Sequence, residues 1–302
     1  MFKLINWLEL EDQCLLILKK DFLNKLIKRR QKLNLTQIRL AKKIGLSRKF
    51  VQTNELGLTS PKVINLKRWL KGLTLSYDCV NKNINYIKTH NKKIFIKFPI
   101  KERSEHIQIL SHAMFDGSKE DRACIRYKVR YDKPTKKLFK TLLIECFGKN
   151  CFGMTDNCYF LYKPLSQLLS NHYKIRDFHS KSTYYSNKIV NMANKNKDIR
   201  KSILKAALLD EGYVGYMPHK GEKCRITIVT SLKNKKLCMQ LYKITKLNKY
   251  NVSIWKARNE SEFTINVLKN SKRVFYDDII SILPKNYYKR ILVEKAIKNN
   301  FI

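Results

Sequence analysis

The sequence predicts an α+β fold, with an N-terminal all-α bundle followed by two similar αββαββα units. Two stretches carry the prediction of paired units: ILSHAMFDGS at 109–118 and LKAALLDEGYVG at 204–215. Each has an apolar run that ends in an acid followed directly by glycine, and a similar alternation of strand-like and helix-like runs follows each. An internal repeat of this length indicates a duplicated architecture. Upstream, short amphipathic segments at 21–73 predict the helical bundle.

The composition points to a polyanionic partner. The chain has 302 residues, of which 63 are Lys or Arg and 24 are Asp or Glu, so its formal net charge is +39. The length is sufficient for two or three compact units, and the hydrophobic content of 44% is sufficient for a real core. Because such a charge opposes compaction unless a polyanion shares it, nucleic acid is the partner that we expect. An AT-biased codon usage that enriches Lys, Asn and Ile is the alternative explanation.

Membrane insertion and secretion find no support in the sequence. No apolar run approaches the roughly 20 residues of a membrane span, and the N-terminus carries acids early without a small-residue cleavage site. The eight cysteines are scattered, and they lack the paired CxxC spacing of a zinc site. Scattered reduced thiols fit an intracellular compartment. We therefore expect a soluble cytoplasmic protein with no membrane partner.

The N-terminal part predicts a series of short helices. Residues 1–20 suit a helical lead-in, and 21–34 and 60–70 have apolar residues at helical spacing. Between them, LTQIRLAKKIGLSRKFVQTNELG predicts two helices joined by a three-residue turn. Thr36 and Ser47 are the expected N-caps of these two helices.

This stretch resembles the helix-turn-helix of the Cro-type phage-repressor family, including its Thr-Gln opening, Ala41 and Gly45 in the turn. The second helix of such a motif lies in the major groove of DNA, where Gln and Asn pair with adenine and Arg with guanine. The resemblance implies DNA contacts from Ser47, Arg48, Lys49, Gln52, Thr53 and Asn54. A small helical bundle with a solvated basic face is the alternative. We expect residues 1–73 to form this domain.

Residues 74–100 are expected to be a connector, followed by repeats at 101–195 and 196–302. The run RACIRYKVRY in the first repeat alternates as a strand does. Its basic side chains would share one strand face: Arg126, Lys128 and Arg130. A solvated strand face would have the same pattern.

The two repeats resemble the LAGLIDADG homing-endonuclease family in its double-motif, single-chain form, over about residues 101–290. The resemblance implies two motif helices packed at a pseudo-two-fold axis, and strands that form a DNA-binding saddle. It also implies that the last acid of each helix binds a divalent metal between the DNA strands. Asp116 and Glu211 fall on these positions, so they are the expected catalytic and metal-binding residues. The cofactor would be Mg²⁺ or another divalent cation, and the protein a monomer with internal pseudo-two-fold symmetry on double-stranded DNA.

Phosphodiester hydrolysis requires charge neutralisation, an activated water and help for the leaving oxygen, which metals held by paired carboxylates supply. An acid kept in both repeats favours this chemistry, although acids are also common at helix-to-strand turns. Lys181 and Lys188 are candidates for a basic residue that assists the water. We therefore expect a site-specific DNA endonuclease, a hydrolase of the homing type. The alternatives are a non-cutting DNA-binding transcription regulator on the same scaffold and, third, an RNA-binding protein in intron maturation.

Overall fold

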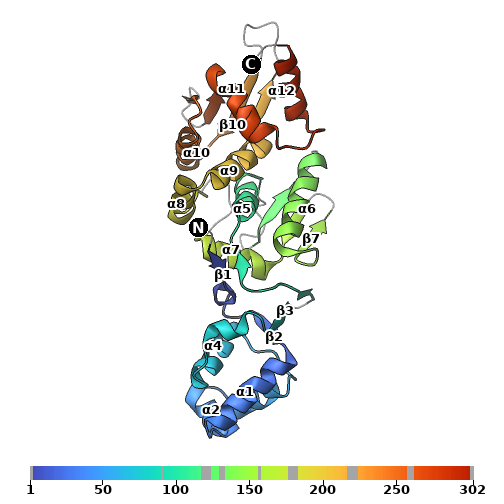
Figure 1. Cartoon of the computed structure of the whole chain (residues 1–302), viewed down its shortest axis with the longest axis vertical. Coiled ribbons are helices and arrows are strands. Elements are labelled where there is room, and N and C mark those ends of the chain that lie inside the picture. Colours follow the sequence, from blue (N-terminus) through green and yellow to red (C-terminus); the bar gives the residue numbers. More distant parts are fainter. Residues whose placement is uncertain are drawn as a thin grey trace. The chain divides into compact units, whose positions relative to one another are not determined.

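A computed structural model describes residues 3–89, 91–116, 124–128, 133–155, 158–175, 183–215, 224–256 and 262–299, except the side chains of Asp116, Lys128, Lys133 and Ser231. The fold is α+β, as predicted, with a helical N-terminal region followed by sheets and further helices (Figure 1). Unit 1 comprises Met1–Glu102, Phe147–Phe152 and Tyr162–His172. Unit 2 comprises Arg103–Cys146, Gly153–Leu161 and Tyr173–Ile302. None of the described helices is long and apolar enough to cross a membrane.

The helices of unit 1 follow the predicted order. They are α1 (Lys20–Lys32), α2 (Gln37–Ile44), α3 (Arg48–Glu55), α4 (Val63–Gly72) and the 3-10 turn η2 (Tyr77–Val80). The side-chain oxygen of Thr36 accepts a hydrogen bond from the N–H of Arg39 at 3.2 Å, and that of Ser47 accepts from Phe50 at 3.1 Å. Gly45 ends α2 at φ +66°, a left-handed conformation that favours glycine. The two predicted caps and the turn are therefore confirmed.

The helical lead-in predicted for residues 1–20 is wrong. This segment forms strand β1 (Leu4–Ile5), the 3-10 turn η1 (Trp7–Glu9) and strand β2 (Leu15–Leu18). β2 pairs antiparallel with β3 (Ile84–Lys88), which also pairs with β4 (Lys93–Ile94). β1 pairs with β5 (Ile100–Lys101). The side chains of β2 alternate between buried and half-buried, so the LLIL run follows the period of a strand and not that of a helix.

A buried ion cluster joins three separate segments of unit 1. His172 lies near the end of α7 (Lys163–Tyr173), between the carboxyl groups of Glu9 and Glu102. Its Nδ1 is 2.7 Å from Oε2 of Glu9, and its Nε2 is 2.8 Å from Oε1 of Glu102. Both ring nitrogens thus lie within hydrogen-bond distance of a carboxyl group. The ring therefore ties α7 to the N-terminal segment and to the end of β5.

Unit 2 contains the duplicated part of the chain. The earlier set of elements is α5 (Ser104–Asp116), β6 (Arg126–Lys128), α6 (Lys133–Phe147), β7 (Phe152–Thr155) and β8 (Cys158–Leu161). The later set is α8 (Asn187–Lys195), α9 (Lys197–Asp210), β9 (Tyr213–Gly215), β10 (Arg225–Leu232), α10 (Lys235–Leu247), β11 (Val252–Lys256), β12 (Phe263–Val267), α11 (Lys269–Phe275), the π-helical turn η3 (Tyr276–Ile280) and α12 (Tyr288–Lys298).

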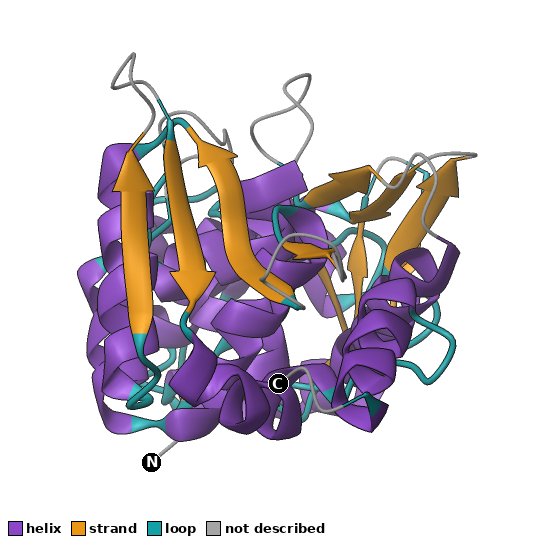
Figure 2. Cartoon of the chain, turned by 90° about the horizontal axis from the view of Figure 1, so that it is seen from above, coloured by secondary structure: helices purple, strands orange, loops and turns teal. Residues whose placement is uncertain are grey.

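The two sheets of unit 2 have corresponding strand orders. The earlier sheet runs β6-β8-β7, and the later sheet runs β10-β12-β11 with β9 added beside β10. In the earlier sheet β6, which precedes α6, pairs with β8. In the later sheet β10, which precedes α10, pairs with β12. The long strands of the later sheet lie side by side over a layer of helices (Figure 2). This shared order is the internal repeat that the two acid-glycine stretches predict.

Candidate nucleic-acid interface and acidic site

One carboxylate holds the helices of the N-terminal domain together. Glu55, at the end of α3, accepts two hydrogen bonds from the guanidinium of Arg30 in α1, at 2.6 and 3.0 Å. Gln37 at the start of α2 donates to the same carboxylate at 2.8 Å. The side chain of Glu55 is 3% exposed, so this bidentate pair is shielded from solvent. The network fixes α3 against α1 and α2.

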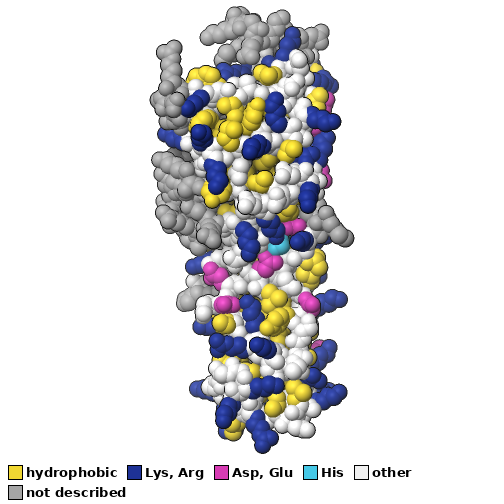
Figure 3. All heavy atoms as spheres, turned by 90° about the vertical axis from the view of Figure 1, so that its left-hand side faces the viewer, with side chains coloured by type: hydrophobic (Ala, Val, Ile, Leu, Met, Phe, Trp, Pro, Cys, Tyr) yellow, Lys and Arg dark blue, Asp and Glu magenta, His cyan; other side chains and the backbone are white. Residues whose placement is uncertain are grey.

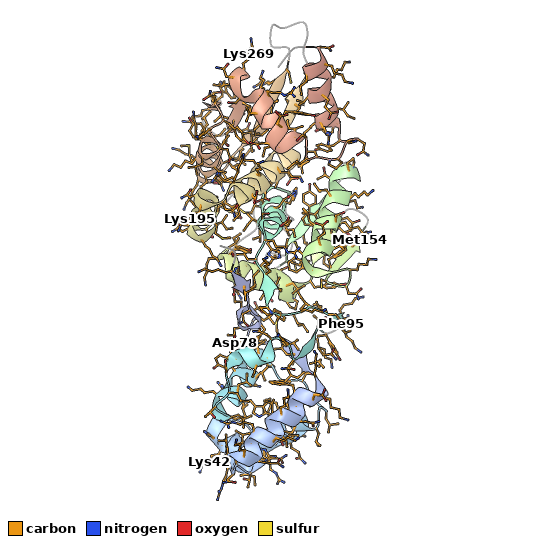
Figure 4. The ribbon with its side chains drawn as sticks, in the orientation of Figure 1. Lys42, Asp78, Phe95, Met154, Lys195 and Lys269 are labelled. Carbon is orange, nitrogen blue, oxygen red and sulfur yellow. The ribbon has the colours of Figure 1, made fainter. Side chains whose placement is uncertain are left out.

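The outer surface of α3 carries most of the predicted DNA contacts. Arg48, Lys49 and Gln52 are exposed, and Thr53 is partly exposed. Ser47 is also exposed, although its hydroxyl group is engaged as the helix cap. Lys42 and Lys43 are exposed on the preceding helix, where Figure 4 labels Lys42. These side chains form one polar and basic surface on the helix that such a domain inserts into a groove.

Asn54 departs from the prediction. Its side chain is 2% exposed, and its Nδ2 donates to the carbonyl of Phe50 at 2.8 Å. The reason is helical spacing, because Val51, Asn54 and Glu55 lie at i, i+3 and i+4 and all three are buried. Asn54 therefore lies on the inner face of α3, and we leave it out of the proposed DNA interface.

The two predicted acids stand at the ends of packed helices. α5 packs against α9, and Asp116 is the last residue of α5. The side chain of Asp116 and all of Gly117 lie outside the described residues. Glu211 caps the C-terminus of α9. Its N–H donates to Ala207 at 2.9 Å, and its carbonyl accepts hydrogen bonds from the N–H of Thr230 at 2.8 Å and from its hydroxyl at 2.9 Å. The backbone at Glu211 is thus fixed by both α9 and β10.

Gly212 is required by close packing at this turn. A Cβ at this position would lie 2.5 Å from the carbonyl oxygen of Leu208 and 2.7 Å from its Cα. Those are backbone atoms of the preceding helical turn, so they cannot move aside as a side chain could. The glycine that follows the acid at the end of α9 therefore has a steric cause.

The carboxyl group of Glu211 is largely desolvated. Burial raises its pKa from 4.5 to about 7, with a further contribution from the neighbouring Asp210, while Lys289 partly opposes the increase. Within the described residues its side chain accepts no hydrogen bond. Lys289 is 2% exposed and donates from Nζ to the carbonyls of Leu208 and Leu209, at 2.6 and 3.0 Å. A cation thus caps the C-terminal end of α9, where the helix dipole is negative.

The adjacent acid, Asp210, is engaged in the interior. Its Oδ2 lies 2.8 Å from Nδ1 of His112 in α5, and its Oδ1 accepts from the hydroxyl of Tyr127 in β6 at 2.5 Å. The side chains of His112 and Asp210 are fully buried. Nε2 of His112 lies 3.3 Å from the amide nitrogen of Gln108. Of the two consecutive acids, Glu211 alone is therefore available to a ligand.

Sequence reasoning did not predict this network. Two polar residues, His112 and Asp210, each interrupt the apolar pattern of a helix that was expected to pack on its counterpart. A buried polar residue requires a partner. One polar residue in each of the two packed helices was therefore a signal that His112 and Asp210 contact each other.

A second polar surface lies on the later sheet. The register pairs Thr227 with both Tyr213 and Asn266, and Asn266 with Ser253, so these side chains share a face. Oδ1 of Asn266 accepts from Thr227 at 2.9 Å and from Nη2 of Arg225 at 3.3 Å. The opposite face buries Ile226, Val252 and Val267. A sheet with one apolar and one polar face offers the polar face to a ligand.

The corresponding residues of the earlier sheet are described only in part. Arg126 is partly exposed, and its guanidinium lies 5.8 Å from the ring centre of Phe160. The side chain of Lys128, and all of Arg130 and Lys181, lie outside the described residues. Lys188 lies over the ring of Tyr173, 5.2 Å from its centre.

The described residues suit a divalent cation in one respect. No group of three or more His, Cys, Asp and Glu side chains within the described part of the chain could hold a metal ion. Glu211 nevertheless offers a hard oxygen ligand whose negative charge is buried and not neutralised by a hydrogen bond. That is the environment that a cation relieves, and Mg²⁺ takes one or two protein carboxylates.

Comparison with known proteins supports the N-terminal assignment. The helix-turn-helix family matches residues 26–78, and no curated protein matches the chain. A structure of the homing endonuclease I-DmoI in complex with DNA and Ca is 17% identical, with a TM-score of 0.41 over 64% of this chain and 97% of that chain. A complex of I-DmoI with DNA and Mn is 16% identical, with a TM-score of 0.38 over 59% and 97%. Mesophilic variants of I-DmoI are 17% identical, with a TM-score of 0.40 over 59% and 96%. Residues 26–78 thus form a helix-turn-helix domain, and DNA is the partner that this domain indicates.

Proposed function

We propose that the protein is a site-specific DNA endonuclease of the LAGLIDADG type, and that its helix-turn-helix adds affinity or specificity. The observation that carries the proposal is the end of α9. There a fixed carboxyl group, Glu211, is desolvated and without a hydrogen-bond partner among the described residues, on a helix packed against the one that ends in Asp116. The repeats at 101–195 and 196–302 would each supply one acid.

Glu211 and Asp116 would hold Mg²⁺ or another divalent cation. When bound, such a cation neutralises charge on the scissile phosphate and lowers the pKa of a coordinated water. Glu211 contributes an oxygen ligand at a fixed position, because its N–H and carbonyl are bonded to α9 and β10. Lys289 holds the carbonyls that end α9, and Asp210 holds α9 to α5 through His112. These residues position the acid but do not touch the reacting atoms.

The DNA would contact two polar surfaces. On α3, Arg48, Lys49 and Gln52 are positioned to reach base edges and phosphates. On the later sheet, Arg225 and Thr227 orient the amide of Asn266 by binding its oxygen, so its nitrogen is left to donate. Arg126, with Lys128 and Arg130, would serve the same role in the first repeat.

Cleavage of a randomised duplex library in Mg²⁺ tests the proposal. The wild-type protein should make double-strand breaks at one long defined site. The double variant Asp116→Asn, Glu211→Gln should keep its binding and lose cleavage. Glu262→Gln, which removes a more exposed acid of the same repeat, is the matched control and should cleave normally.

Specific binding without cleavage in any divalent metal would refute the endonuclease. It would leave the second candidate, a non-cutting DNA-binding regulator. The observation that favours this candidate is the complete helix-turn-helix, with both caps and the Arg30–Glu55 pair in place.

A further inference from the structure

The helices α8 and α10 of unit 2 pack against each other and present a surface without acids. We name the exposed part of this surface the α8–α10 flank, and its charged residues are Lys195, Lys235, Lys236, Lys243 and Lys246. Exposed amides accompany the lysines, at Asn191 and Asn194 of α8. Figure 3 faces the side that α8 and α10 occupy in Figure 1, and in unit 2 it shows Lys and Arg side chains across the face and acids along its edge.

The lysines of the flank differ from other lysines of unit 2 in their partners. Within the described residues, none of the five forms an ion pair with an acid. The neighbouring lysines of α9 differ, because Lys197 and Lys201 both contact Asp278, at 3.4 and 2.5 Å. The charge of the flank is therefore a local excess, and not only a consequence of the basic composition.

Aromatic rings restrain two of these ammonium groups. Nζ of Lys236 lies 3.3 Å from the ring centre of Tyr184, and Nζ of Lys246 lies 5.7 Å from that of Tyr242. A ring face attracts the cation without neutralising its charge. Both ammonium groups are thus held in place with their positive charge available to a ligand.

Hydrogen bonds between side chains and the backbone hold the flank in place. The amide nitrogen of Asn234, the N-cap of α10, donates to the carbonyl of Thr183 at 2.7 Å. Gln240 of α10 bonds both the N–H and the carbonyl of Tyr185, at 2.9 and 2.8 Å. Ser186 then caps α8 by accepting from the N–H of Ile189 at 3.3 Å. The segment that leads into α8 is thus fixed to α10 before the helix begins.

The spacing of the flank suits a regular polyanion. Lys236 and Lys243 are seven positions apart, so they lie on one face of α10 about 10 Å apart along its axis. The inner side of α10 buries Leu237, Leu241 and Ile244, and the helix packs against β11 and β12. The flank therefore faces away from the sheet, on the opposite side of α10, and it is separate from the polar strand face at Asn266.

We propose that the α8–α10 flank is a second nucleic-acid surface, which binds the phosphate backbone without reading sequence. Fixed ammonium groups and amides provide hydrogen bonds to phosphate oxygens. A lipid surface fits less well, because the apolar residues of both helices are mostly turned inward and the exposed ones on α10 are Met239 and Leu247. The helix-turn-helix domain of the same chain indicates a nucleic-acid partner, so nucleic acid is favoured over an acidic protein as the ligand of the flank.

Amine-reactive footprinting of the full chain tests the proposal. Acetylation of each lysine is measured by mass spectrometry with no ligand, with a mixed-sequence DNA duplex, with a folded RNA of equal mass, with anionic phosphatidylserine vesicles and with polyglutamate. Duplex or RNA should protect Lys236, Lys243 and Lys246, while the exposed Lys269, Lys285 and Lys298 of the same unit keep their reactivity. Figure 4 labels Lys195 and Lys269, which lie at different ends of this unit. Stronger protection by one nucleic acid identifies the source of the phosphates.

A salt titration of nucleic-acid affinity provides the second measurement. The variant Lys236→Gln, Lys243→Gln, Lys246→Gln should reduce the slope of log affinity against log salt by about 0.9 for each phosphate that it no longer neutralises. The control variant Lys269→Gln, Lys285→Gln, Lys298→Gln has the same net charge and should keep the wild-type slope. Equal slopes for both variants, or protection by vesicles or polyglutamate and not by nucleic acid, would overturn the proposal.

Discussion

The helices α5 and α9 occupy equivalent places in the two repeats, yet their buried faces differ in chemistry. α9 buries apolar and small residues, which are Ile199, Ile203, Leu204, Ala206, Ala207, Leu208 and Leu209. α5 buries polar residues as well as apolar ones. Its buried polar residues are His106, Gln108, Ser111 and His112. The small and apolar side chains of α9 thus permit close approach of the two helices, whereas the polar side chains of α5 fix their alignment by hydrogen bonds. Asp210, at the end of α9, forms the contact with His112 of α5.

The largest expected effect comes from breaking that connection. Asp210→Leu leaves His112 and Tyr127 without their buried acceptor, and His112→Leu leaves the carboxylate of Asp210 without its imidazole. Each single change should lower the free energy of unfolding by about 3–5 kcal/mol. The double variant should lower it by clearly less than the sum, because neither the imidazole nor the carboxylate is then left buried without the other, although the hydroxyl of Tyr127 still loses Asp210 as acceptor. Urea unfolding measures all three, with Asp198→Asn, an exposed acid of α9, as control. Additive losses would show that the pair is not coupled.

The ends of the two helices can be compared through pH. The folded protein holds a proton on Glu211 up to pH about 7, which the unfolded chain releases near pH 4.5. Stability should therefore fall as pH rises between these values, by about 3 kcal/mol at most. Glu211→Gln should remove this component, and Asp116→Asn provides the same comparison for α5. Thermal unfolding from pH 4 to 8 is the measurement, and parallel curves for wild type and Glu211→Gln would contradict the prediction.

The cation that caps α9 is expected to have a smaller effect. Lys289→Met removes the ammonium from the carbonyls of Leu208 and Leu209, so the free energy of unfolding should fall by about 2 kcal/mol. Because Lys289 lowers the pKa of Glu211, the same variant should also raise the titration midpoint of that carboxyl group. Carbon-detected NMR follows the midpoint. An unchanged midpoint would show that Lys289 stabilises the end of α9 without affecting the carboxyl group of Glu211.

The smallest change makes α5 resemble α9. The hydroxyl of Ser111 donates to the carbonyl of Ile107 at 2.8 Å and accepts from the hydroxyl of Tyr185 at 3.0 Å. Ser111→Ala should cost about 1 kcal/mol, because Tyr185 is buried and loses its acceptor. Adding Tyr185→Phe removes the unmatched hydroxyl, so part of the loss should be recovered. Differential calorimetry measures both, and a further loss in the double variant would mean that packing and not hydrogen bonding is responsible.

Features that depend on neighbouring residues were predictable. Thr36, Gly45 and Ser47 act within one or two turns of their own helices, so the cap chemistry was legible in the sequence. The glycine after Glu211 was predictable for the same reason, because the close packing that requires it comes from the preceding turn of its own helix.

Features that depend on a distant partner were not predictable. β2 is a strand because β3, far along the chain, supplies its hydrogen bonds. The same holds for Asp210, whose burial depends on His112 in the other repeat. Asn54 was misplaced for a different reason, because its polar side chain suggested an outer face although its spacing from Val51, a local signal, places it on the inner face.

The pairing of β2 with β3 has a consequence for the engineering of the chain. Lys19 and Asn83 flank the whole helical segment and are joined by a backbone hydrogen bond of 2.9 Å. The segment thus leaves the sheet and returns to it at neighbouring points, as an insertion in a hairpin does. An inserted domain with adjacent ends can be exchanged for another without stretching its host. The helical segment therefore begins and ends at adjacent points of this sheet. A replacement helix-turn-helix would need the same end spacing, and also the backbone hydrogen bonds that join Pro61 and Val63 to Leu16 and Cys14.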